Sequence, residues 1–150
     1  ELIYRALPVN PFRIIVVVPQ IDNYKLKPLL ERVTLADALH NIGEIPILLE
    51  ALRVGDLKLL ALTIEDKLNA PRIANAINGF ESVVEAARKL GALAVTVSGD
   101  GPALLAFAEN RHERIADEIR LALRDVGITA RTWVLPIDTQ GVVISAMQSA

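Results

Sequence analysis

Apolar residues along the chain follow two different spacings, which predicts a protein built from both strands and helices. Phe12 to Val18 is a largely β-branched run closed by Pro19, the pattern of a buried strand. Arg111 to Val126 is the clearest amphipathic helix, and Gly127 is expected to end it. The inward face of that helix carries Ile115, Ile119, Ala122, Leu123 and Val126.

The remaining segments follow the same logic. Thr34 and Asp37 resemble a capping box that starts a helix, and Pro46 is expected to break that helix or to start a new turn. A further helix after Asp56 is expected to bury Leu57, Leu60, Ala61, Ile64 and Leu68. We also predict a loop over 69–79, a helix over 80–90, strands over 92–97, 103–107 and 129–135, and a last strand over 141–145.

The order of these elements predicts the fold. With the additional helices set aside, the core reads βαββαβ, the split βαβ or ferredoxin-like plan. We therefore expect an α+β domain over 1–150, with a mostly antiparallel sheet and helices packed on one face. Hydrophobic residues make up 52% of the chain and aromatic residues only 4%, so the predicted core is aliphatic.

Composition excludes several classes of function. The net charge is −2 and basic residues are scattered, which argues against nucleic acid and against an anionic membrane surface. No apolar run is long enough to span a bilayer. The absence of cysteine excludes thiol chemistry and fits a reducing cytoplasm, while His40 and His112 are too far apart for a usual metal motif. Glu65 and Asp66 are adjacent, so we interpret them as a solvated face.

The segment Ser98-Gly99-Asp100-Gly101-Pro102 carries the most information about function. Two glycines that flank one residue let a hairpin turn tightly and let a ligand approach the backbone. Ser98 offers a hydroxyl, and the backbone N–H groups of such a turn can bind an anion. A simple glycine-rich hairpin turn is the alternative interpretation, and spacing alone does not separate the two.

The segment from Gly91 to Phe107 resembles the third motif of the GHMP small-molecule kinases, which include galactokinase, homoserine kinase and mevalonate kinase. In that family a helix and a strand lead into Ser-Gly-Ala-Gly-Pro, and an apolar strand follows. The resemblance extends over most of the chain and is closest to the homoserine kinase branch. It includes Leu35 to Ala38 with Asn41, Leu48 to Leu52, Gly55 to Leu57, Asp66 to Leu68 with Pro71, Gly79 to Glu81, Gly127 to Ala130, and Asp138 with Gly141.

This resemblance implies the C-terminal half of a two-domain kinase that uses ATP and Mg²⁺ to phosphorylate L-homoserine in threonine biosynthesis. An N-terminal half, absent here, would hold most of the nucleotide, and the chain begins at Glu1 with what reads as mid-chain sequence. The turn from Ser98 to Pro102 would close the cleft against the ATP phosphates. We therefore expect the isolated chain to be inactive. Its expected partners are its own N-terminal domain, an amino-acid substrate and a possible second copy in a homodimer.

Three departures from the family pattern bear on the acceptor. Where homoserine kinases carry Ser-Thr-x-x-Ala-Arg, Asn23 stands at the Thr position and Lys27 at the Arg position. Where they carry His-x-Pro-Tyr-Arg, Ile73 stands at the Arg position and Arg72 one residue earlier. Asn23, Lys27 and Arg72 are the implied substrate-binding residues, although Lys27 and Arg72 are equally compatible with solvated surface groups.

The third departure is Asp100, which replaces a small Ala. A carboxylate repels ATP phosphates unless Mg²⁺ or a basic side chain intervenes, and it can instead meet a substrate ammonium or simply face water in the turn. A related kinase with another small hydroxylated acceptor is one alternative. Two other classes of function also remain open, an amino-acid-binding regulatory module and an oligomerisation domain.

Overall fold

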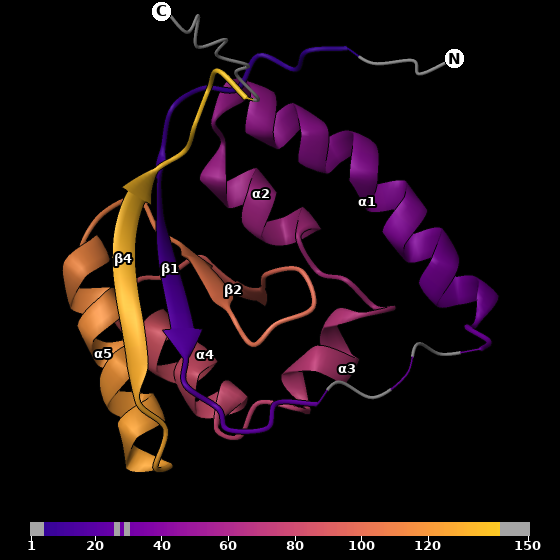
Figure 1. Cartoon of the computed structure of the whole chain (residues 1–150). Coiled ribbons are helices and arrows are strands. Elements are labelled where there is room, and N and C mark those ends of the chain that lie inside the picture. The colour runs from indigo at the N-terminus through magenta and orange to yellow at the C-terminus, as the bar shows by residue number, and fades with distance from the viewer. Residues whose placement is uncertain (1–4, 26–27, 29–30, 142–150) are drawn as a thin grey trace, which may run out of the picture.

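The computed structural model describes residues 5–25, 28 and 31–141 of the chain (Figure 1). Its strands form one four-stranded antiparallel sheet in the order β2-β3-β1-β4. The elements are β1 (Arg13–Pro19), α1 (Leu35–Val54), α2 (Leu57–Thr63), α3 (Ala70–Ala74), α4 (Phe80–Lys89), β2 (Ala94–Val97), β3 (Leu104–Phe107), α5 (His112–Asp125) and β4 (Ala130–Pro136).

The sheet consists of two interleaved split βαβ units. Strand β3 lies between β1 and β2, and β1 lies between β3 and β4, so each helical crossover skips one strand. In register, Val17 faces Leu104 on one side and Thr132 on the other. The predicted α+β, ferredoxin-like fold is confirmed.

One face of the sheet is covered by α4 and α5 and contains the main core. Alternate residues of β1 point to this face, so Ile15 and Val17 are fully buried while their neighbours are not. Burial of one such side chain stabilises the fold by about 1.5–3 kcal/mol. The helices contribute Val83, Ala87, Ile115, Ile119 and Leu123 to the same cluster, at the helical spacing expected from the sequence.

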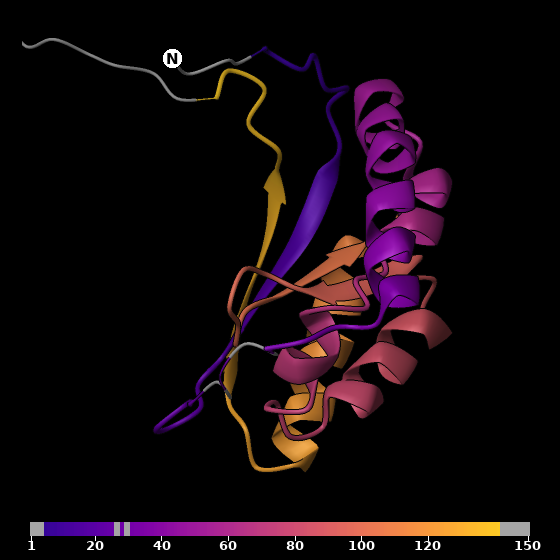
Figure 2. The same ribbon diagram turned by 90° about the vertical axis from the view of Figure 1, so that its right-hand side faces the viewer.

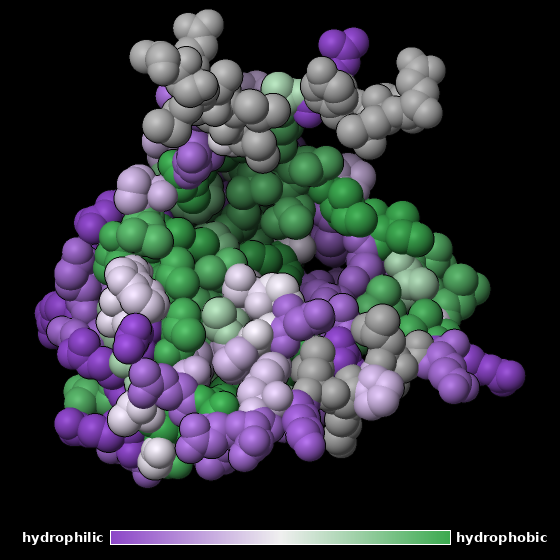
Figure 3. Space-filling model, in the orientation of Figure 1, coloured by the Kyte–Doolittle hydropathy of each residue, from purple (hydrophilic) through white to green (hydrophobic). Residues whose placement is uncertain are grey.

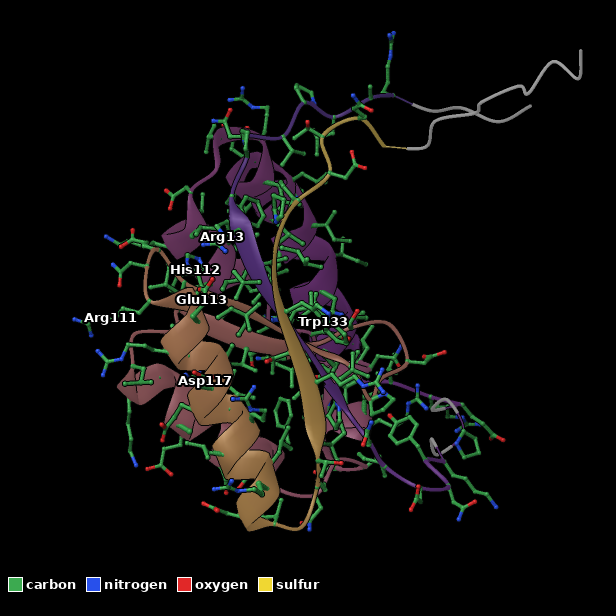
Figure 4. The ribbon with its side chains drawn as sticks, turned by 60° about the vertical axis from the view of Figure 1, so that its left-hand side comes forward. Arg13, Arg111, His112, Glu113, Asp117 and Trp133 are labelled. Carbon is green, nitrogen blue, oxygen red and sulfur yellow. The ribbon has the colours of Figure 1, made fainter. Side chains whose placement is uncertain are left out.

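The opposite face is only partly covered. Ala51 of α1 and Leu60 of α2 pack with Ala94 and Phe107, which covers the part of this face formed by β2 and β3. Over β1 and β4 the face is open: Figure 2 shows the helices gathered on one side of these two strands, and Figure 3 shows hydrophobic side chains across the exposed side. Trp133 lies on the side of β4 away from α5 (Figure 4) and is 42% exposed, and Leu135 is 44% exposed.

Figure 4 also shows an ion pair between the central strand β1 and α5. Arg13 on β1 reaches Glu113 in the first turn of α5, with 3.1 Å between the guanidinium and the carboxylate. Both side chains are largely exposed, so this pair contributes about 0–1 kcal/mol. Packing of the buried aliphatic side chains therefore contributes most of the stability that holds α5 against the sheet.

Helix α1 runs through Pro46 without ending, so the predicted break at this residue is wrong. Proline removes one helical hydrogen bond and costs about 3 kcal/mol in a helix interior. Both ends of α1 are well capped, because the Thr34 hydroxyl accepts from the Asp37 N–H at 3.0 Å and Gly55 closes the helix at φ 74°. The predicted start at Thr34 is confirmed, and packing along α2 holds the second half of the helix.

Three other boundaries differ from the prediction. Helix α2 ends at Thr63, so Ile64 and Leu68 lie beyond it, and the short helix α3 lies within the predicted loop. Of the predicted last strand, Gly141 is not in a strand and the rest lies outside the described residues. In the part of the chain that the structure describes, no helix is long and apolar enough to cross a membrane.

Candidate functional site

The turn from Ser98 to Pro102 connects β2 to β3 as predicted. The Ser98 N–H donates to the Ala103 carbonyl at 2.8 Å, and the Gly101 N–H donates to the Ser98 carbonyl at 2.9 Å. Gly99 and Gly101 both have left-handed backbone conformations, at φ 53° and φ 70°. A residue with a Cβ is strained in this conformation, which explains the glycine at both positions.

Tyr24, on the loop that follows β1, holds this turn in place. Its hydroxyl donates to the Asp100 carbonyl at 3.0 Å, and Asn23, before it, adopts the left-handed conformation that asparagine tolerates. A Cβ on Gly101 would lie 2.5 Å from the Tyr24 hydroxyl oxygen and 2.7 Å from a methyl carbon of Ile73. Only glycine therefore allows the turn to come this close to Tyr24 and α3.

Arg72 of α3 also approaches this turn. Its side chain is only 8% exposed, and its guanidinium donates to the Asn69 side-chain oxygen at 3.2 Å and 2.9 Å. The guanidinium lies 3.8 Å from the carboxylate of Asp100, whose side chain is 83% exposed. Arg72 is thus a basic side chain next to the Asp100 carboxylate, while its neighbour Ile73 is buried in the core.

These charges act on Tyr24. Burial raises the pKa of the Tyr24 phenol, with Arg72 lowering that pKa and Asp100 raising it to a lesser extent. The phenol therefore stays protonated and able to donate its hydrogen bond throughout the physiological pH range.

Asp66 supports α3 and with it Arg72. Its carboxylate accepts hydrogen bonds from the N–H groups of Leu68, Asn69 and Ala70, at 2.7, 3.1 and 3.0 Å, and from the Asn41 side chain of α1 at 2.7 Å. Burial raises the pKa of Asp66, but these hydrogen bonds outweigh burial and hold the pKa below its usual value. The interpretation of Asp66 as part of a solvated face is wrong.

The structure thus brings together some of the residues expected from the sequence. The turn and Arg72 meet, Asn23 is exposed on the loop that carries Tyr24, and Lys27 lies outside the described residues. Sequence reasoning missed Tyr24 as the residue that holds the turn by a hydrogen bond to the Asp100 carbonyl. Among the described residues, no group of three or more acidic, His or Cys side chains is placed to hold a metal ion.

A separate groove lies along the free edge of β2. It has a volume of about 500 Å³ and is lined by residues of α2, α3 and β2, including Asp66 and Pro71. Its lining does not include Tyr24, Arg72 or the turn, so the groove adjoins the supporting network of the site rather than the site itself.

The comparison with protein families gives a clear result. The family described as GHMP kinases C terminal matches residues 48–129, which include Arg72 and the turn from Ser98 to Pro102. The chain therefore belongs to the GHMP kinase C-terminal family.

Within this family, the similar proteins include homoserine kinases. That of Moorella thermoacetica is 36% identical over 113 residues, which are 75% of this chain and 38% of that protein. That of Pyrococcus furiosus is 34% identical over 129 residues, which are 84% of this chain and 44% of that protein. The chain spans less than half the length of the curated relatives it matches.

Solved structures agree on the fold. Homoserine kinase from Cytophaga hutchinsonii matches 94% of this chain and 46% of its own, with a TM-score of 0.78 and 21% identity. Leishmania major mevalonate kinase, in complex with R-mevalonate, matches 93% of this chain and 46% of its own, with a TM-score of 0.53 and 18% identity.

Proposed function

We propose that this chain is the C-terminal half of an ATP-dependent kinase that phosphorylates the hydroxyl of L-homoserine, a step of threonine biosynthesis. The observation that carries the proposal is that Arg72 lies beside the Ser98–Pro102 turn, which Tyr24 holds by a hydrogen bond to Asp100. The turn is the element expected near the phosphates, and Arg72 is expected to bind the acceptor. The homoserine kinases among the relatives support this choice of acceptor.

The turn is suited to a phosphate because of its open backbone. A Cβ on Gly99 would meet no atom within 4 Å, so a ligand can approach this peptide closely. In the proposal, Ser98, Gly99, Asp100, Gly101 and Pro102 form the wall that closes on ATP. In the proposal, Mg²⁺ and most of the nucleotide would be bound by an N-terminal half.

The contribution of this chain to catalysis would be positioning. Phosphoryl transfer depends mainly on orientation and electrostatic stabilisation of the transferred group. Arg72 would fix the acceptor carboxylate, assisted by Asn23 and Lys27, and thereby aim the hydroxyl. Its guanidinium is held by Asn69 before substrate arrives, which reduces the ordering needed on binding.

The open face over β1 and β4 supports an N-terminal half as the partner of this domain. Large apolar side chains are exposed both on this face and along α1, including Trp133, Leu135, Leu35, Leu39 and Ile42. Trp133 is the single tryptophan of the chain, so its fluorescence reports on this face. We expect the isolated chain to self-associate, which size-exclusion chromatography measures. We also expect Trp133 emission to lie at shorter wavelength in a protein that carries both halves. Unchanged emission would exclude the face over β4 as the contact between halves.

The test of function is an ATP-dependent phosphorylation assay on the intact protein that contains this chain. L-homoserine, mevalonate, shikimate and no acceptor are offered in parallel. Turnover on homoserine supports the proposal, and turnover on another acceptor or on none overturns the proposed substrate. The isolated chain, assayed beside it, should show no transfer, and turnover by this sample would contradict the assignment of the nucleotide site to the other half.

A kinase for another small hydroxylated acid is the second candidate. The specific observation in its favour is Ile73, which is 1% exposed and removes the arginine that homoserine kinases carry at this position. The mevalonate arm of the assay addresses this candidate directly.

A further inference from the structure

We propose that Asp100 binds the ammonium group of the acceptor while Arg72 binds its carboxylate, so that the pair selects α-amino acids over hydroxy acids that lack an amino group. This inference rests on the proposed function. It assigns a role to the one residue of the turn that departs from the family pattern, where a small Ala offers no charge.

The first support is the placement of two opposite charges at one point from two separate elements. Arg72 comes from α3 and Asp100 from the turn between β2 and β3, and 3.8 Å separates their nearest nitrogen and oxygen atoms. A tight charge-assisted hydrogen bond has a length of about 2.7–2.9 Å. The two groups are therefore adjacent without being closed into a bidentate pair, and an α-amino acid presents the complementary pair of charges on one carbon.

The second support is the contrast between the surroundings of the two groups. The Arg72 side chain is 8% exposed and anchored on Asn69, whereas the Asp100 side chain is 83% exposed. An ionised carboxylate has acceptor capacity for several hydrogen bonds at once. Asp100 can thus receive an ammonium group from the solvent side while Arg72 stays in place beneath it.

The third support is that the backbone of Asp100 is fixed. Tyr24 donates to its carbonyl at 3.0 Å, and Gly101 packs against Tyr24 and Ile73. A carboxylate on a fixed backbone is a preorganised ligand, because little freedom is lost when the substrate binds. The same carboxylate repels an acceptor that brings a carboxylate and no ammonium, and such repulsion is an effective source of specificity.

The experiment compares L-homoserine with 4-hydroxybutyrate, the same acceptor without the amino group, as substrates of the intact protein. Asp100→Asn removes the charge and keeps the shape, Asp100→Glu keeps the charge, and Asp22→Asn removes an exposed charge from the neighbouring loop as the matched control. The measured quantity is kcat/KM for L-homoserine divided by kcat/KM for 4-hydroxybutyrate.

We expect Asp100→Asn to lower this ratio about tenfold, through a higher KM for homoserine, as loss of a charged hydrogen bond predicts. Asp100→Glu should keep the ratio within about threefold of the parent, and Asp22→Asn should not change it.

Other outcomes overturn the inference. An unchanged ratio in Asp100→Asn places Asp100 outside acceptor recognition, and a lower KM for both acceptors means that Asp100 competes with the substrate carboxylate for Arg72. Failure of the proposed function is distinguishable, because it is seen in the unmodified protein as a lack of homoserine turnover before any variant is compared.

Discussion

The two glycines of the Ser98–Pro102 turn provide a sharp test of how this site is held together. Gly99 and Gly101 share a left-handed backbone, so alanine at either position costs about 1–2 kcal/mol in backbone strain. Their surroundings differ, because a Cβ on Gly99 meets nothing within 4 Å and a Cβ on Gly101 meets Tyr24 at 2.5 Å and Ile73 at 2.7 Å. Gly99→Ala is therefore a matched control for Gly101→Ala.

The additional cost at Gly101 follows from what has to move. Ile73 is 1% exposed and packed in the core, so it cannot turn away into solvent, and overpacking of this kind costs about 1–3 kcal/mol. Displacement of Tyr24 also loses its hydrogen bond to Asp100, a further loss of about 0.5–1.5 kcal/mol. We expect Gly101→Ala to lower the free energy of unfolding by about 3–6 kcal/mol in total, against about 1–2 kcal/mol for Gly99→Ala.

The assay is urea unfolding of the purified chain, followed by circular dichroism and fitted with a common slope. If Gly101→Ala alone does not fold, the double variant Gly101→Ala/Tyr24→Ala provides the measurement, since removal of the ring opens space for the new methyl group. Where Gly101→Ala does fold, the double variant should be more stable than the sum of the two single losses predicts. Equal losses at Gly99 and Gly101 would refute the reasoning, because the close contact would then contribute nothing.

Three further predictions concern the supports of the site. Asp66 has a pKa below its usual value in the folded chain, so its contribution to stability is complete above about pH 4 and is lost as the pH falls through the folded-state pKa. Asp66→Asn should therefore lower the free energy of unfolding at pH 7 by about 1–3 kcal/mol. On the acid side of a pH series, the free energy of unfolding of the variant should fall less steeply than that of the parent; parallel curves for the two proteins would contradict this. Tyr24→Phe should cost about 0.5–1.5 kcal/mol and increase amide hydrogen exchange in the turn, with Tyr24→Leu adding a packing loss. Asn41→Ala should lower protection of the α3 amides more than that of α4, and equal effects on both helices would show that Asp66 does not transmit the change.

The sequence predicts those parts of the fold whose cause is local. Strand β1 and helix α5 follow from the spacing of their own apolar residues, and both are found close to the predicted limits. Helix α3 was not predicted because it starts on the carboxylate of Asp66 rather than on an apolar stripe. Helix α1 continues through Pro46 because its capped ends and its packing on α2 outweigh one lost hydrogen bond.

The candidate site also has parts that are set locally and parts that depend on distant contacts. The spacing of the glycines is enough to predict the turn, since its backbone conformation depends on those residues themselves. The contact of Tyr24 with Asp100 joins residues on separate elements and has no sequence pattern. The proximity of Arg72 to the turn depends on the direction of side chains around α3, where Ile73 faces the core and its neighbour faces the turn.

The central position of β1 has a consequence for how the chain is made. Of the four strands of this sheet, β1 is made first, and its neighbours β3 and β4 begin only at Leu104 and Ala130. Both edges of a hydrophobic strand thus wait for partners that follow much later in the sequence, and such long-range pairing is slow and prone to aggregation. A nascent chain released before Ala130 would present one unpaired edge of β1, a natural target for chaperones that bind extended apolar segments.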